Sequence, residues 1–250
     1  MNDRLTGIIL RQEDYKERAA LVTVLTREYG RLTLLANGVR KVNSRNAGSL
    51  FPYTKGEFIL DYKKDKTFFT LHGVHTVAFY RRLHTDIEAQ SAAACAGELA
   101  FVLSSEGGGQ TYIQTLYDAL ESLLTMLEEA KRYDLVFALF LAEILRLLGI
   151  APEVDACVIS GSKQVAAISV REGGFVHADY IQETDAVRYD AARLRQFRLV
   201  NKARFADYDR ITDLLPSCAW IVRLLIAFLQ AHADLSLRSF RMLEQMLEEK

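Results

Sequence analysis

The sequence contains few of the residues on which disulfide frameworks, metal centres and membrane anchors depend. Cysteine occurs three times among 250 residues, as Cys95, Cys157 and Cys218. An odd number of widely spaced cysteines does not predict a disulfide framework, so we expect free, mostly buried thiols. No apolar run reaches the roughly 18 residues of a membrane span, and no signal peptide is recognisable at the N-terminus. These absences predict a cytosolic protein.

No arrangement of residues argues for covalent chemistry. The Ser, His and Asp residues lie in no recognisable catalytic context. On a strand, the side chains of His72 and His75 would point to opposite faces, so we do not expect a shared metal ion. A triple glycine at 107–109 has no strand before it and no Gly-Lys-Ser/Thr after it, so it predicts a loop between helices rather than a phosphate cradle. The sequence therefore predicts no catalytic residues and no enzyme.

Charge is distributed unevenly along the chain. Residues 1–82 contain fifteen Lys and Arg against eight Asp and Glu, a net charge of +7, whereas the remainder has a net charge of −8. A basic part joined to an acidic part is the composition expected of a nucleic-acid binder with an attached scaffold.

The hydrophobic pattern changes from strands to helices near residue 83. Five short strand-like segments with turn signals between them predict a closed or nearly closed barrel in the first 80 residues, and an OB-type barrel fits this count. We therefore predict an α+β protein with an OB-fold nucleic-acid-binding domain at 1–82 and a helical domain at 83–250, with a small β insertion at 151–180. The helical spacing predicts helices at 85–103, 112–129, 133–148, 186–200, 204–215, 220–232 and 235–247.

A basic segment lies between two stretches of the predicted barrel. Residues 38–45 (Gly-Val-Arg-Lys-Val-Asn-Ser-Arg) place Arg40, Lys41 and Arg45 on a connection held by strands, which is typical of a loop that contacts phosphates. A solvated turn is the competing interpretation, because these are ordinary surface residue types. Around this loop we expect further DNA-binding side chains: Arg11, Arg31, Tyr53 and Lys55, with Arg81 and Arg82 beyond them.

Aromatic residues are frequent in the same region. Stacking of a base on an aromatic ring is worth about 1 to 3 kcal/mol, but a barrel of this size also needs large side chains in its core. We expect Phe51 and Phe58 to lie in the core. Tyr53, Tyr62 and Phe68 lie near loop or strand ends and are the better stacking candidates.

Segments spread over most of the chain resemble, in their order and spacing, a known family. They are 7–10 (Gly-Ile-Ile-Leu), 21–30 (Leu-Val-Thr-Val-Leu-Thr-Arg-Glu-Tyr-Gly), 38–41 (Gly-Val-Arg-Lys), 52–58 (Pro-Tyr-Thr-Lys-Gly-Glu-Phe), 147–157 (Leu-Leu-Gly-Ile-Ala-Pro-Glu-Val-Asp-Ala-Cys) and 235–240 (Leu-Ser-Leu-Arg-Ser-Phe). The first four are similar to the OB domain of the RecO family, bacterial recombination mediators and DNA-repair proteins. The last two are similar to its join with a zinc-ribbon segment and to its C-terminal helix.

The resemblance implies a function in DNA repair and recombination after DNA damage. It implies binding of single- and double-stranded DNA, annealing of complementary strands, and help in loading the recombinase RecA together with RecR and single-stranded-DNA-binding protein. It also implies work at the bacterial nucleoid. If the acidic tail of single-stranded-DNA-binding protein docks here as in the family, an apolar pocket rimmed by cations is needed, for which Lys131, Arg132 and Arg146 are candidates; an ordinary exposed face is the competing interpretation.

One segment departs from the family pattern. Many relatives have two Cys-x-x-Cys pairs within 157–180, whereas the matching positions here are Cys157, Ser160, His177 and Tyr180. A structural zinc site needs four Cys or His ligands, and only Cys157 and His177 qualify. We therefore expect neither zinc nor another cofactor.

Other functions remain open on the sequence. Barrel, aromatic residues and charge do not distinguish ribose from deoxyribose, so an OB-fold RNA binder is one alternative. A protein-interaction scaffold with an inert basic loop is a second, and a metal-dependent nuclease is a third.

Overall fold

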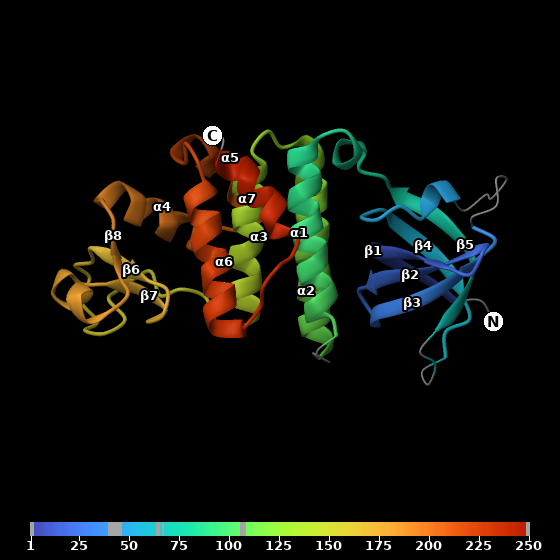
Figure 1. The fold of residues 1–250 in the computed structure, drawn as a ribbon, viewed down its shortest axis with the longest axis horizontal. Coiled ribbons are helices and arrows are strands. Elements are labelled where there is room, and N and C mark those ends of the chain that lie inside the picture. The colour runs from blue at the N-terminus through green and yellow to red at the C-terminus, as the bar shows by residue number, and fades with distance from the viewer. Residues whose placement is uncertain (1–2, 40–46, 64–65, 67, 106–108, 249–250) are drawn as a thin grey trace. The chain divides into compact units, whose positions relative to one another are not determined.

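The computed structural model describes residues 3–39, 47–63, 66, 68–105 and 109–248. The chain forms two compact units, Met1–Glu128 and Glu129–Lys250, and each is described by itself (Figure 1). The first unit contains a β-barrel and two long helices.

Five strands close the barrel in the order β1-β2-β3-β5-β4, and all neighbours are antiparallel except β3 and β5. This closed five-stranded barrel confirms the predicted OB-like fold. The strands are β1 (Asp3–Tyr15), β2 (Ala19–Thr26), β3 (Gly30–Asn37), β4 (Lys55–Leu60) and β5 (Phe69–Ala78).

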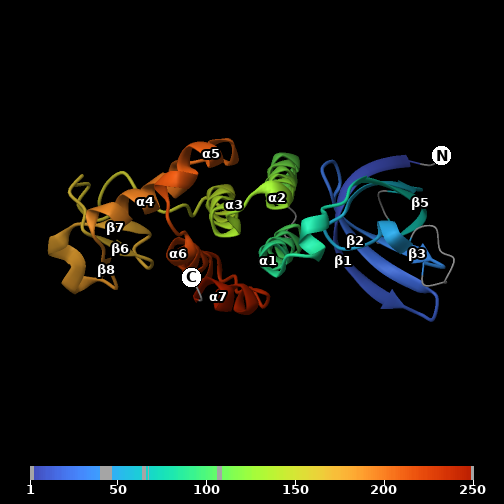
Figure 2. The same cartoon turned by 90° about the horizontal axis from the view of Figure 1, so that it is seen from above.

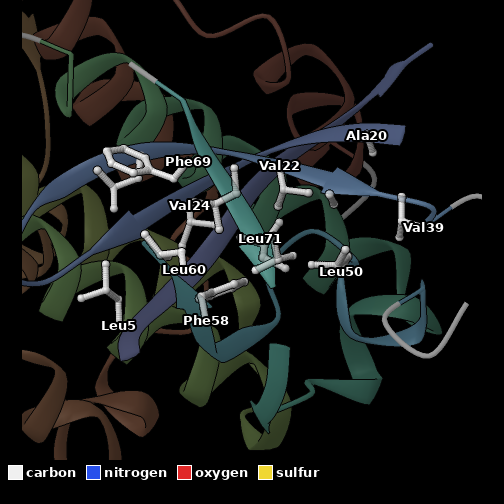
Figure 3. Close-up of a cluster of buried hydrophobic side chains, with 14 residues drawn as sticks. Leu5, Ala20, Val22, Val24, Val39, Leu50, Phe58, Leu60, Phe69 and Leu71 are labelled. Carbon is white, nitrogen blue, oxygen red and sulfur yellow. The ribbon is translucent and has the colours of Figure 1, made fainter. Parts of the chain in front are cut away.

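Alternate side chains of the strands fill the barrel, as Figure 3 shows. Phe58 is 1% exposed, which confirms its predicted place in the core. Phe51 is 48% exposed, so its predicted core position is wrong. It follows the short 3-10 turn Ala47–Ser49 outside the strands, where no pleat directs it inward. Gly7 is needed in β1 beside β2, because a Cβ at this position would lie 2.3 Å from the Val24 side chain.

Two helices complete the first unit after a 3-10 turn, Arg81–His84. They are α1 (Ile87–Leu103) and α2 (Gln110–Glu129). Asp86 begins α1, because its carboxylate accepts hydrogen bonds from the backbone N–H groups of Glu88 and Ala89.

The second unit packs around α3 and α6, of which α3 is buried nearly all round. In Figure 2 a small sheet in the order β7-β6-β8 lies beside α4. The elements are α3 (Tyr133–Leu147), β6 (Ala167–Ser169), β7 (Gly174–Val176), β8 (Val187–Arg188), α4 (Ala191–Lys202), α5 (Tyr208–Ile211), α6 (Ala219–Ala233) and α7 (Phe240–Glu248). No described helix is both long and apolar enough to cross a membrane.

Two predicted helices of this unit differ from the structure. The helix predicted at 186–200 begins only at Ala191, because Val187 pairs with Ile168 of β6 and the Asp190 side chain caps the helix at the N–H of Arg193. The helix predicted at 204–215 is a single α-helical turn between two 3-10 turns.

Candidate nucleic-acid interface

Some outward side chains of β1 and β2 are buried rather than open to solvent. Ile9 and Val24 point into the barrel core, so their neighbours Ile8, Thr23 and Leu25 point outward. These three outward side chains are nevertheless 0%, 7% and 0% exposed. α1 and α2 lie beside the barrel (Figure 1, Figure 2), and α1 packs on β1. Strands 2 and 3 form the usual oligonucleotide face of OB folds. Here Arg31 of β3 contacts Phe101 of α1, while the outward side chains of β3 stay partly exposed.

Ion pairs connect α2 to the barrel. Residues 83–128 contain no Lys or Arg and seven Asp and Glu; we call α1 and α2 the acidic helical pair. The Arg27 guanidinium donates two hydrogen bonds of 2.9 Å to the Asp118 carboxylate, and Lys55 pairs with Glu121. The acidic helical pair therefore neutralises barrel cations on its side.

Three predicted DNA-binding cations, Arg11, Arg31 and Lys55, have intramolecular side-chain contacts. Arg31 donates to the backbone carbonyl of Phe101 at 2.7 Å, and its guanidinium lies 4.4 Å from the centre of that ring. Arg11 is half exposed, pairs with Glu13 at 2.8 Å and lies 5.8 Å from the Phe101 ring centre. The Lys55 side chain is 21% exposed beside Glu121. The roles of Arg11, Arg31 and Lys55 in DNA binding stay predictions.

The remaining cations of the predicted surface divide into two groups. Arg40, Lys41 and Arg45 lie outside the described residues. Arg81 and Arg82 donate their backbone N–H groups to the Glu128 carboxylate at 3.1 and 2.9 Å, and the Arg82 guanidinium also pairs with Asp86.

Tyr53 lies between the barrel and α1. Its N–H donates to the Ile9 carbonyl at 2.7 Å, and its backbone has a positive φ of 66°. The ring lies against Gly97, where a Cβ would be 2.5 Å from the ring carbon Cε1. Burial, with smaller effects of Cys95 and Glu98, raises the pKa of the Tyr53 hydroxyl to about 12. One side of the Tyr53 ring, a predicted stacking residue, therefore packs against α1.

Other aromatic rings gather at the two ends of the barrel. At one end, Tyr62 lies between Tyr29 and Phe69, with ring centres 4.2 and 5.3 Å away, and Phe68 is 56% exposed. At the other end, Phe51 contacts Phe79 and His84. This second group was not predicted from the sequence, although Val77 and Phe79, two residues apart at the end of a strand, are a signal for an outward apolar pair.

Comparison with known proteins decides the family. A family model described as "Recombination protein O N terminal" matches residues 1–80, and one described as "Recombination protein O C terminal" matches residues 84–241. The chain belongs to the RecO family. The DNA repair protein RecO of Exiguobacterium sibiricum is 28% identical over 99% of this chain and 98% of its own length. The DNA repair protein RecO of Bacillus subtilis is 26% identical over 98% of this chain and 95% of its own length.

In this RecO-family chain, the three cations predicted for a partner site lie at two separate places. Arg132, at the start of α3, donates two hydrogen bonds of 2.8 Å to Asp134 and one of 2.7 Å to the Leu215 carbonyl. Arg146, about 20 Å further along α3, pairs with Glu143 at 2.7 Å and donates to backbone carbonyls. A surface cavity of about 170 Å³ lies beside Lys131 and Arg132 but not beside Arg146, and Pro216 and Leu247 also line it.

The four positions at which the family resemblance implies zinc ligands hold Cys157, Ser160, His177 and Tyr180. Cys157 is 2% exposed, and its Sγ accepts the N–H of His177 at 3.2 Å. Burial raises the pKa of the thiol, but hydrogen bonds from Ser160 and from backbone N–H groups outweigh it and leave the pKa below its ordinary value. The His177 Nδ1 accepts the N–H of Asp179 at 3.3 Å.

The donor chemistry at these positions does not fit a zinc ion. Ser160 and Tyr180 offer hydroxyl groups, which are not ligands of structural zinc. Among the residues that the structure describes, no three His, Cys, Asp or Glu side chains gather into a group that could hold a metal.

Proposed function

We propose that this chain is a non-enzymatic recombination mediator in DNA repair. In this proposal it binds single- and double-stranded DNA, anneals complementary strands and assists the loading of RecA together with RecR and single-stranded-DNA-binding protein, at the bacterial nucleoid. The observation that supports it is a closed OB-like barrel in a region with a net charge of +7, within a chain that the RecO family models match over most of its length.

Annealing requires no covalent step, which agrees with the absence of a catalytic arrangement in the sequence. Two strands repel each other through their phosphates, and a cationic surface lowers this repulsion by releasing condensed counterions. Because Arg27 and Lys55 are paired with carboxylates of the acidic helical pair, we propose that Arg40, Lys41 and Arg45 supply the principal phosphate contacts.

The decisive experiment is fluorescence anisotropy of a labelled single-stranded oligomer over a series of salt concentrations. For single strands, log K falls against log salt by about 0.7 per phosphate neutralised. A variant with Arg40→Ala, Lys41→Ala and Arg45→Ala is expected to bind more weakly, with a slope shallower by about two units.

The matched control removes three exposed cations of the second unit, by Arg171→Ala, Arg188→Ala and Arg210→Ala, and is expected to keep the slope of the wild type. Equal slopes for both triple variants would contradict the assignment of the basic segment. A matched RNA oligomer that displaces the DNA at lower concentration would instead favour an RNA binder.

We further propose that the cavity beside Lys131 and Arg132 receives the acidic tail of single-stranded-DNA-binding protein. Lys131 is the residue to change, because Arg132 already holds Asp134. Lys131→Glu is expected to abolish most binding of a fluorescent tail peptide, whereas Arg210→Glu, an exposed reversal elsewhere in the unit, is expected to leave it intact. Equal peptide binding by both variants would exclude this cavity.

A further inference from the structure

Three side chains of the first unit, at the C-terminal end of β5, form an exposed group of rings. The rings of Phe79 and His84 are stacked, with centres 4.7 Å apart and an angle of 7° between their planes. Phe51 meets both edge-on, at 6.4 and 5.9 Å. Phe51 and Phe79 are 48% and 40% exposed. We call these three residues the ring cluster.

The ring cluster extends an open face of the barrel. Along β5 the outward side chains are exposed, including His75 and Val77, and Phe79 continues this row just beyond the strand. Single exposed apolar residues are normal on a protein surface, but an adjoining set of them marks an interaction site. The acidic helical pair packs on β1 and contacts the ends of β2 and β3 through Arg27 and Arg31. The exposed outer face of β5 is available to a strand of nucleic acid that reaches this barrel.

The chemistry around the ring cluster favours a nucleic acid over an apolar protein surface. Arg81 is exposed and lies in the chain between Phe79 and His84, and within the described residues no carboxylate pairs with its guanidinium. The nearby carboxylates are already bonded, since Glu128 accepts the backbone N–H groups of residues 81 and 82 and Asp86 pairs with Arg82. Flat rings beside an available cation are the combination that holds unpaired bases and their phosphates.

We propose that the ring cluster stacks unpaired bases of a single DNA strand that runs along the outer face of β5, with Arg81 contacting a phosphate of that strand. This inference rests on the proposed function and adds to it the place and the chemistry of base contact. It requires unstacked bases, so it applies to single strands and not to a closed duplex.

The test compares a Phe51→Ala and Phe79→Ala double variant with the wild-type full chain, by anisotropy on three probes: a thymine oligomer, an abasic oligomer of equal length and a duplex. We expect the double variant to bind the thymine oligomer at least about ten-fold more weakly, with an unchanged salt slope because no phosphate contact is removed. Binding of the abasic oligomer and of the duplex should be unchanged. A Leu214→Ala and Met242→Ala double variant, which removes exposed apolar side chains from the second unit, should behave as the wild type.

Each failure has a distinct meaning. If the wild type binds none of the probes, the proposed function fails as well. If the wild type binds and the Phe51→Ala and Phe79→Ala variant binds the thymine oligomer equally well, the ring cluster is not a base site and the proposed function stands. An equal loss on the abasic oligomer would also overturn the inference, because the rings would then act through the fold or the phosphates.

A milder variant guards against damage to the fold. Phe79→Leu keeps an apolar side chain and removes only the flat ring, so it should show a loss on the thymine oligomer while the thermal unfolding temperature stays at the wild-type value. Phe79→Trp should bind the thymine oligomer well and report stacking directly. A stacked thymine quenches tryptophan fluorescence, whereas the abasic oligomer has no base that could do so. Trp220, the one native tryptophan, supplies the background from the wild type. A Phe79→Trp signal that does not respond to thymine would contradict stacking.

Discussion

Tyr53 can lie against α1 because residue 97 has no side chain. A Cβ at this position would lie 2.5 Å from the Tyr53 ring, well inside ordinary contact distance. Glycine in a helix interior costs up to about 1 kcal/mol relative to alanine. The close approach of the ring to the helix explains why this cost is tolerated.

We therefore expect Gly97→Ala to destabilise the first unit, although alanine is the better helix former. Overpacking should cost about 1 to 3 kcal/mol and exceed the gain in helix propensity. In a Tyr53→Ala background the ring is gone, and the same change should become stabilising by up to about 1 kcal/mol. Urea unfolding of the four proteins measures both effects. Gly73→Ala is the control, because a Cβ there would meet Ile59 at an ordinary 3.6 Å. If Gly97→Ala changed the stability in the same direction in the wild-type and Tyr53→Ala backgrounds, this account would be contradicted.

The limits of the sequence are clearest for single residues. Phe58 could be placed in the core because strand alternation directs it there. Phe51 could not, since it follows a 3-10 turn to which no alternation applies. Arg31 is a residue type that commonly contacts DNA, so the sequence predicts a DNA contact. Its hydrogen-bond acceptor, the carbonyl of Phe101, is 70 residues away along the chain. Tertiary contacts of this kind decide whether a cation is available, and no local pattern reveals them.

At the scale of elements, a small polar cluster joins the beginnings of α3 and α6. Asp134 accepts two hydrogen bonds from Arg132 and a third, of 2.7 Å, from the N–H of Cys218. Burial raises the pKa of Asp134, but the hydrogen bonds from Arg132 and Cys218 outweigh it, so the pKa lies below its ordinary value. A lowered pKa in the folded state means that the ionised carboxylate stabilises the fold.

This stabilisation should be complete above about pH 4, the ordinary pKa of an aspartate, and should be lost as the pH falls through the lower pKa of the folded state. Asp134→Asn is expected to reduce the stability of the second unit at pH 7 by about 3 kcal/mol and to flatten its decline in acid. Denaturant unfolding at a series of pH values from 7 to about 2 tests this. Asp209→Asn, at an exposed position, should change neither quantity, and a full acid decline in Asp134→Asn would exclude the cluster as its cause.

The small sheet shows what sequence patterns resolve at this scale. The small β insertion predicted at 151–180 contains the observed hairpin of β6 and β7. β8 was not predicted, because a two-residue strand has no periodicity and Val187 is fixed only by its pairing with Ile168.

The same sheet leads to a prediction about metal. Since only Cys157 and His177 carry zinc-ligand chemistry at the four matching positions, the sheet should be held by packing of residues such as Ile168 and Val176, both buried. Dialysis against a strong chelator should leave the unfolding temperature unchanged, and metal analysis should find no stoichiometric zinc. A fall in unfolding temperature that added zinc reverses would show that ligands come from elsewhere in the chain.

At the scale of the whole molecule, the extent of the first compact unit has a consequence for truncation. The outward side chains of Ile8 and Leu25 are buried under α1 and α2. A fragment of residues 1–82, the predicted OB domain, would expose them, whereas a fragment of residues 1–128 keeps them covered. Burial of each such side chain contributes about 1.5 to 3 kcal/mol.

We expect the 1–128 fragment to unfold cooperatively and to stay monomeric, and the 1–82 fragment to aggregate or to bind a hydrophobic dye. Circular dichroism, dye fluorescence and gel filtration of the two fragments test this. Replacing Ile8 and Leu25 by threonine in the shorter fragment is the control and should reduce its aggregation. A 1–82 fragment as stable as 1–128 would contradict the importance of the covered face.

The pairing of a basic barrel with acidic helices makes the first unit an electric dipole. Residues 1–82 and 83–128 have net charges of +7 and −7, so at long range the unit has almost no monopole with which to attract every polyanion. If the chain binds DNA as proposed, an approaching strand exerts a torque that turns the positive end of the unit toward it within about one Debye length, roughly 8 Å at physiological salt. The charge distribution would then set the orientation of the encounter, and the proposed contacts at the barrel, rather than the overall charge, would set the lifetime of the complex.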